Sequence, residues 1–224
     1  MSKSENLARI KTNLAVEFLK MGDTRNAISS INEAVRADSH FLNAWLIRAQ
    51  IYQYIKMPAQ VEESFRRALS ISAGSGEVNN NYGWYLCENN QVDKSIGYFD
   101  KALGDMTYGG HYIVWMNKGI CLGRLGHYEE ANSALLTSIR QAPGFYFSLK
   151  ELAKLNLNHN NGSLAEVYFQ QYVNQAPGLG PDDLLLGVKI GRLNNKYDWV
   201  ARYGDQLRQQ YPTSQELQDM LSGK

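Results

Sequence analysis

This 224-residue chain has few cysteines and no large excess of charge of either sign. It also lacks long apolar runs. No uninterrupted apolar run approaches the ~20 residues that a membrane-spanning helix needs. The formal net charge is +1, which gives no reason to expect a nucleic acid or an anionic membrane surface as partner. Polar residues follow Met1 directly, so we expect a cytosolic protein or a sequence from which a secretory leader has been removed. The two cysteines do not decide between an oxidising and a reducing compartment.

Sequence patterns of catalysis and of metal binding are also missing. No phosphate-binding loop, nucleophile elbow or HExxH sequence is present. Asp182 and Asp183 follow Pro181, and we interpret them as a helix start favoured by the helix dipole. The four histidines fall in or near predicted turns, without metal-ligand spacing to one another or to cysteine: His40, His111, His127 and His159. We therefore expect no enzymatic activity, no cofactor and no metal site.

The stretch from Tyr112 to Pro143 shows the pattern around which the chain is organised. Each half carries an apolar stripe with the three-to-four-residue spacing of a helix. A short turn at 126–128 separates the halves and permits only an antiparallel return. Gly119 and Ala131 are small and fall where the two helices must touch. One such segment therefore predicts a helical hairpin.

The hairpin pattern recurs along the chain, as when Ala165 and Pro177 repeat Ala131 and Pro143 after 34 residues. This pattern resembles the tetratricopeptide repeat (TPR), whose period is about 34 residues. One hairpin cannot bury its own apolar face, so neighbours must stack. We expect an all-α TPR solenoid, a right-handed superhelix of about six helical hairpins. The expected segments are a frayed polar tail at 1–7, repeats at 8–41, 42–75, 76–109, 112–145, 146–179 and 180–213, and a capping tail at 214–224.

In a TPR-like array, the first helices of the repeats line a concave groove, and here this groove is the predicted partner-binding site. Asparagines are poor helix formers, and a tryptophan beside asparagine and glutamate is typical of a recognition surface. The expected lining comprises Glu77, Asn80, Trp84, Glu88, Met116, Arg124, Lys150 and Lys154. The alternative is that Trp84 packs against a neighbouring helix and the asparagines are solvated. The carboxylate clamp of co-chaperone TPRs is not expected, because Thr12, Val16 and Leu46 occupy its positions.

The segment NNYGWYLC at 80–87, with six repeats and the GHYEEA turn, resembles the PilF/PilW family of TPR outer-membrane lipoproteins, and its neisserial members most closely. The resemblance implies a non-enzymatic scaffold or pilotin of type IV pilus biogenesis, on the periplasmic side of the outer membrane. The implied partners are the pilus secretin or other pilus-assembly proteins, and the implied role is support of secretin multimers and fibre stability.

Members of this family are anchored by an acylated N-terminal cysteine, and no cysteine stands near Met1. We therefore expect the lipid anchor to be missing from this chain, and the chain itself to be soluble and monomeric. Two other readings stay open: a generic TPR peptide-binding adaptor or co-chaperone, and a regulatory TPR domain of a larger enzyme.

The resemblance also bears on Cys87 and Cys121, which lie near the ends of the first helices of repeats three and four. Neighbouring helices pack ~8–10 Å apart, so the two cysteines can come within disulfide range. Two buried free thiols are the alternative. The oxidising periplasm that the resemblance implies favours the bridge.

Overall fold

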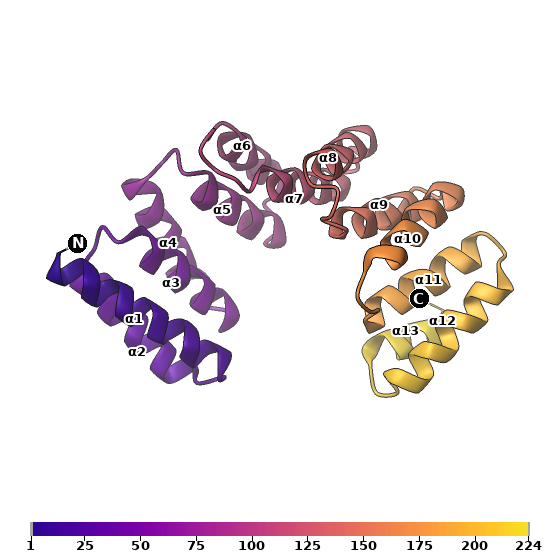
Figure 1. Cartoon of the computed structure of the whole chain (residues 1–224), viewed down its shortest axis with the longest axis horizontal. Helices are drawn as coiled ribbons and strands as arrows, with labels where there is room; N and C mark the ends of the chain where they lie inside the picture. The colour runs from indigo at the N-terminus through magenta and orange to yellow at the C-terminus, as the bar shows by residue number, and fades with distance from the viewer. Residues whose placement is uncertain (1, 224) are drawn as a thin grey trace. The chain divides into compact units, whose positions relative to one another are not determined.

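The computed structural model describes residues 2–223, and every regular element in that range is an α-helix (Figure 1). The predicted all-α TPR architecture is therefore confirmed. The helices are α1 Lys3–Lys20, α2 Thr24–Ala37, α3 Leu42–Tyr54, α4 Pro58–Ile71, α5 Gly76–Glu88, α6 Val92–Leu103, α7 His111–Arg124, α8 Tyr128–Gln141, α9 Phe147–Asn158, α10 Gly162–Gln175, α11 Pro181–Leu193, α12 Tyr197–Gln210 and α13 Gln215–Ser222.

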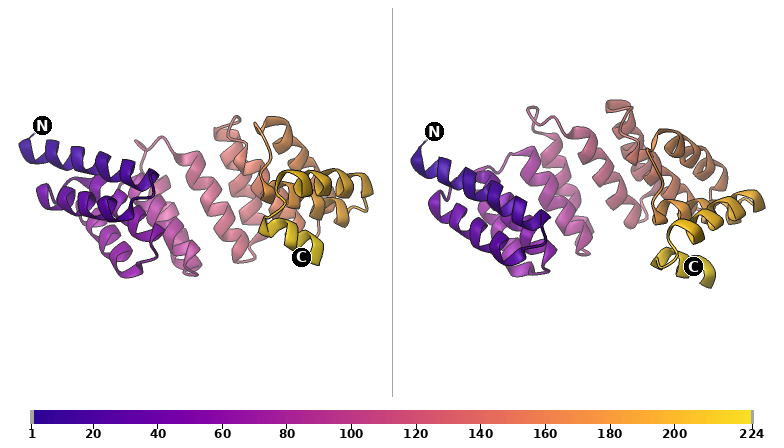
Figure 2. Two further views of the ribbon diagram at one scale, coloured as in Figure 1. Left: turned by 90° about the horizontal axis from the view of Figure 1, so that it is seen from below. Right: turned by 60° about the horizontal axis from the view of Figure 1, so that its bottom comes forward.

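Consecutive helices form antiparallel hairpins, as the two further views in Figure 2 also show for α1 with α2. Each of six hairpin turns contains one residue with positive φ. In most of these turns a backbone amide also donates to the carbonyl five residues earlier, the bond of a Schellman helix end. The left-handed residues recur once per hairpin along the chain: Gly22, Lys56, Asn90, Gly126, Asn160 and Asn195.

The N-terminal segment differs from the expected frayed tail at 1–7, because α1 begins at Lys3. The Ser2 side chain accepts a hydrogen bond from the Glu5 amide, and the Glu5 carboxylate accepts one from the Ser2 amide. This capping box satisfies two amides that would otherwise lack partners. The Ser-x-x-Glu spacing is readable in the sequence and could have predicted the helix start.

The chain divides into two compact units. The N-terminal unit comprises the residues up to Leu86 together with Gly97–Gly109. Its core contains two apolar clusters: one joins α1, α2 and α3 around Ile31 and Ile51, and the other surrounds Phe65. Fully buried alanines, such as Ala15 and Ala27, lie where α1 and α2 touch. Small side chains at these positions allow the close helix packing that a TPR hairpin requires.

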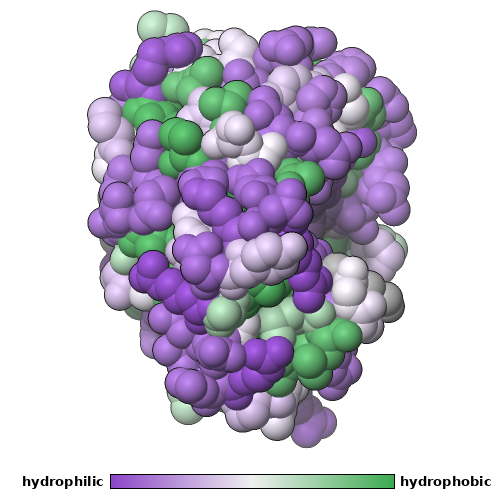
Figure 3. Space-filling model, turned by 90° about the vertical axis from the view of Figure 1, so that its right-hand side faces the viewer, coloured by the Kyte–Doolittle hydropathy of each residue, from purple (hydrophilic) through white to green (hydrophobic). Residues whose placement is uncertain are grey.

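The C-terminal unit comprises Cys87–Ile96 and the residues from Gly110 onward. Its largest cluster surrounds Phe169 and Tyr203, whose rings meet edge to face. The predicted capping tail is largely helical, because α13 buries Leu217 and Met220 against this cluster. Hydrophilic residues cover most of the face shown in Figure 3, and the apolar patches on it are small. Among residues 2–223, no helix is both long enough and apolar enough to span a membrane.

Candidate functional site

A cavity of about 250 Å³ lies between α3 and α5 within the N-terminal unit. We call it the N-terminal cavity, and its lining is Asn43, Leu46, Ile47, Gln50, Gln53, Phe65, Glu77, Asn81 and Trp84. Residues spaced by three or four positions share one face of a helix, so α3 and α5 each present one stripe to the cavity. Of the predicted groove residues, Glu77 and Trp84 belong to it.

The floor of the N-terminal cavity is apolar and its rim is polar. Leu46 and Phe65 are 7% and 2% exposed, so the core holds both side chains in place. Glu77 is exposed at the rim, and Trp84 is partly buried. An apolar floor with a few polar groups around it is the usual composition of a binding site. The predicted place of Glu77 and Trp84 in a binding groove stays a prediction.

Asn80 does not belong to this surface, which corrects its predicted place in the groove. Asn80 is 4% exposed, and the neighbouring Asn79 is fully buried. The Asn79 side chain donates to the carbonyls of Ala73 and Ser75, both at 2.8 Å, and so holds the loop before α5. Asn81 is the asparagine that lines the cavity. Two of the three consecutive asparagines are therefore buried in the fold.

The start of α5 is also fixed by a residue that sequence reasoning missed. The Asp105 carboxylate accepts a hydrogen bond of 2.7 Å from the amide of Gly76. A Cβ at Gly76 would lie 2.5 Å from Cβ of Tyr108, so only glycine fits there without movement. These contacts hold the first turn of α5, which carries Glu77, against the loop after α6.

A second cavity, of about 440 Å³, lies within the C-terminal unit between α7, α8 and α9. We call it the C-terminal cavity. Arg124 and Lys154, two of the predicted groove residues, line it, and Lys154 pairs with Glu151 at 2.9 Å. Met116 is partly buried on α7 and lies outside the lining of this cavity. Sequence reasoning missed the aromatic pair at its edge, Tyr128 and His159, whose rings stack 3.9 Å apart.

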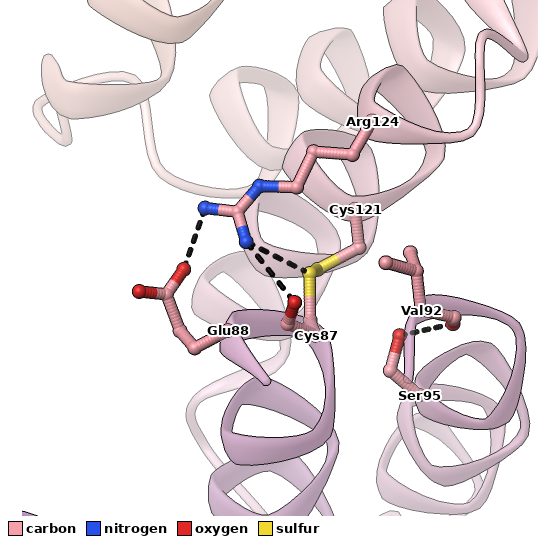
Figure 4. Close-up of a disulfide and its surroundings, with 6 residues drawn as sticks. All are labelled: Cys87, Glu88, Val92, Ser95, Cys121 and Arg124. Atoms are coloured by element: carbon pink, nitrogen blue, oxygen red, sulfur yellow. Dashed lines mark hydrogen bonds and ion pairs between the residues drawn. A yellow bond between two sulfur atoms is a disulfide. The ribbon is translucent and has the colours of Figure 1, made fainter. Parts of the chain in front are cut away.

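Arg124 connects the C-terminal cavity to a disulfide between Cys87 and Cys121 (Figure 4). The Cα atoms of the two cysteines are 6.0 Å apart, and both residues are buried. One Arg124 nitrogen donates to the Cys87 carbonyl oxygen at 3.2 Å, and the other contacts the Glu88 carboxylate at 2.5 Å. Glu88 and Arg124 are thus brought together as an ion pair. Between the two alternatives left by the sequence, bridge or free thiols, the structure contains the bridge.

Lys150 lines neither cavity, and its predicted place in the groove stays a prediction. Its ammonium contacts the carboxylates of Asp182 at 2.5 Å and Asp183 at 2.6 Å, at the N-terminus of α11. Burial disfavours the charged ammonium, but hydrogen bonds with these two carboxylates outweigh it and raise the pKa of Lys150. Burial, followed by a hydrogen bond with Asp183, also raises the pKa of Tyr172. Lys150 therefore joins α9 to α11.

Within residues 2–223, no group of three or more histidine, cysteine, aspartate or glutamate side chains could hold a metal ion. Asp183 accepts a 2.8 Å hydrogen bond from the Gly180 amide, so this residue caps α11, as the sequence indicated. The linings of the two cavities contain apolar side chains, side-chain amides and charged groups.

Comparison with known proteins places the chain in a family. A family model described as tetratricopeptide repeat matches residues 12–75. The solved structure of PilW, a widely conserved type IV pilus biogenesis factor, is 42% identical to this chain, covers 96% of this chain and 98% of its own, and has a TM-score of 0.89. The chain belongs to the PilW family.

Two further comparisons agree with this family. The type IV pilus assembly protein PilF of Pseudomonas aeruginosa is 26% identical over 211 residues, covering 94% of this chain and 83% of the relative. A solved structure from a functional characterization of Pseudomonas aeruginosa PilF covers 100% of both chains, with 24% identity and a TM-score of 0.82. This second likeness shows that the fold is shared.

Proposed function

We propose that this PilW-family protein is a non-enzymatic scaffold, or pilotin, of type IV pilus biogenesis that binds another pilus-assembly protein. The pilus secretin is the first candidate partner, and the consequence of binding is support of secretin multimers and pilus fibre stability. The N-terminal cavity carries the proposal, because it joins an apolar floor to a rim of amides and one carboxylate. Aromatic anchors in such cavities commonly dominate protein binding, and Trp84 is the anchor here.

The proposed location is the periplasmic side of the outer membrane, with a lipid anchor in the native protein. The buried disulfide between Cys87 and Cys121 supports this location, because structural disulfides persist in the periplasm and are rare in the cytosol. A co-chaperone with a carboxylate clamp is less well supported. Thr12 is buried and donates to the Ala8 carbonyl, and Leu46 lies in the cavity floor.

The test is partner capture by the Trp84→Ala protein. Truncating a buried aromatic anchor commonly costs at least ~2 kcal/mol of binding, about thirtyfold in affinity. We expect Trp84→Ala to bind detergent-solubilised secretin about thirtyfold more weakly and to support fewer secretin multimers and pili. Tyr197→Ala is the matched control, because Tyr197 is 79% exposed on α12 in the other unit. Circular dichroism and thermal melting must show both variants folded.

The capture experiment distinguishes a wrong binding site from a wrong function. If folded Trp84→Ala captures secretin and assembles pili as the wild type does, the N-terminal cavity is not the binding site. If the wild-type protein captures no pilus-assembly protein at all, the scaffold function itself is wrong.

A further inference from the structure

The charge in the lining of the N-terminal cavity is negative only. Glu77 is its one charged lining residue, and no lysine, arginine or histidine is among the other eight. Glu77 is exposed, and within residues 2–223 its carboxylate makes no ion pair with a cationic side chain. Glu62 and Glu63 nearby on α4 differ, since Tyr82 donates to the first and Arg48 pairs with the second. Glu77 therefore lines the N-terminal cavity with a carboxylate that makes no ion pair and no side-chain hydrogen bond within residues 2–223.

Four side-chain amides surround the same cavity: Asn43, Gln50, Gln53 and Asn81. Within the part of the chain that the structure describes, none of these amides hydrogen-bonds another residue. Other asparagines of the chain do: Asn32 bonds Arg48, and the Asn156 amide donates to the Leu152 carbonyl at 2.8 Å. A side-chain amide both donates and accepts hydrogen bonds, as a peptide group does. Amides that are grouped at one cavity and not used by the fold are suited to bind the backbone of another segment.

The apolar floor and the amides restrict the shape of the bound segment. Leu46, Phe65 and Trp84 form an apolar surface for a large apolar side chain. An α-helix satisfies most of its backbone N–H and C=O groups internally, so a bound helix would leave the four side-chain amides without backbone partners. An extended segment presents these backbone groups to the amides. An extended segment that inserts one side chain fits better than a helix.

We propose that the N-terminal cavity binds an extended peptide segment in which a lysine or arginine stands next to a large apolar residue. The apolar side chain contacts the floor, the amides bond the segment's backbone, and the cation pairs with Glu77. An acidic neighbour is disfavoured, because its carboxylate would approach Glu77 with no cation in the lining to offset the repulsion. This inference rests on the proposed function, since it names the chemistry of the segment that this cavity takes.

The experiment uses three octapeptide pools and the purified protein. Each pool has a central leucine and one neighbour fixed as lysine, glutamine or glutamate, with uncharged residues at random in the other positions. Retention on immobilised protein is measured by mass spectrometry. We expect retention in the order lysine, glutamine, glutamate, with about fivefold between successive pools, as a partly exposed ion pair of ~1 kcal/mol would give.

Two variants test the assignment to Glu77 and to the amides. Glu77→Gln should remove the charge order while keeping retention of the glutamine pool. Glu129→Gln is its matched control, because Glu129 is also an exposed acid in a first helical turn, and it should keep the order. Gln50→Ala should weaken all three pools equally, whereas Gln171→Ala, exposed on α10, should change none.

The inference is overturned if the wild type retains the three pools equally, retains none of them, or keeps the charge order after Glu77→Gln. Secretin capture by the same wild-type preparation distinguishes these results from failure of the proposed function. If capture persists and depends on Trp84, the scaffold function stands and only the chemistry of the bound segment is wrong.

Discussion

Gly119 on α7 and Leu135 on α8 approach so closely that a Cβ at position 119 would lie 2.7 Å from Cγ of Leu135. The same Cβ would be 3.1 Å from the carbonyl oxygen of Ala131. Backbone on one side and a 1%-exposed leucine on the other leave little room for relaxation. The hairpin of α7 and α8 therefore depends on glycine at this position.

The first prediction is that Gly119→Ala destabilises the protein by ~1–3 kcal/mol, the usual cost of overpacking a core. Gly97→Ala on α6 is the matched control, because a Cβ there has no atom within 4 Å. In a helix interior, alanine is favoured over glycine by ~1 kcal/mol, so the control should be neutral or stabilising. Urea unfolding measures both free energies. Equal changes in the free energy of unfolding for the two substitutions would contradict the prediction. They would show that helix propensity, and not the contact with Leu135, determines the effect at position 119.

The second prediction concerns the buried Arg48, whose side chain joins three helices. Its guanidinium donates to Asn32 at 3.2 Å, to Ser64 at 2.7 Å and to Glu63 at 3.0 Å. Arg48→Met should lower the free energy of unfolding by on the order of 3 kcal/mol, because polar groups inside the hairpins lose their partner. Arg66→Met, at an exposed position of α4, should stay within about 0.5 kcal/mol of the wild type. A loss below about 1 kcal/mol in Arg48→Met would mean that the network contributes little net stability.

The third prediction is that the disulfide stabilises the protein. Cys87 and Cys121 are 34 residues apart, and in the chain-entropy model a loop of this length contributes ~3–4 kcal/mol. Reductant should therefore lower the denaturation midpoint of the wild type. The double variant Cys87→Ser with Cys121→Ser should start at that lower midpoint and not respond to reductant. A wild-type midpoint that reductant leaves unchanged, with reduction verified by thiol labelling, would refute the prediction.

Helical periodicity explains both what the sequence could predict and where it failed. The hairpins and the contact at Gly119 follow from apolar spacing and small residues, because a helix face repeats every three or four positions. That rule cannot separate Asn80 from Asn81, since both lie three or four residues from Glu77 and from Trp84. Packing decides between them: Asn80 is 4% exposed, and Asn81 lines the cavity.

Contacts between distant repeats could not be predicted from one sequence either. The sequence predicts Lys150 in the groove because it falls on the first helix of its repeat. Its ion-pair partners, Asp182 and Asp183, are more than thirty residues away, and the sequence indicates for them only a helix start. The register between neighbouring hairpins determines which charges meet, and single-sequence periodicity does not contain that register.

The last prediction follows from the ion pair between Lys150 and Asp182. Burial favours the neutral acid, but the hydrogen bond and charge of Lys150 outweigh it and hold the pKa of Asp182 below its ordinary value of 3.8. A carboxyl group whose pKa is lowered by folding stabilises the folded state above its unfolded pKa, and this contribution is lost as pH falls through the folded-state pKa. Lys150 sets the upper end of the pH range in which the ion pair stabilises the fold, because its pKa is raised above 10.5. Its contribution is complete below pH 10.5 and is lost as pH rises through the raised value.

We therefore expect Asp182→Asn to be less stable than the wild type at neutral pH, with a difference that shrinks below pH ~3.8 and again above pH ~10.5. Urea unfolding of both proteins across this range measures the difference, and Asp182, being more than half exposed, makes it modest. Asp205→Asn is the control, since Asp205 pairs with Arg208 on the exposed face of α12, where the pair contributes little at any pH. A stability difference for Asp182→Asn that stays constant from neutral to acid pH would contradict the prediction. It would show that Asp182 contributes through its position in the first turn of α11 and not through its charge.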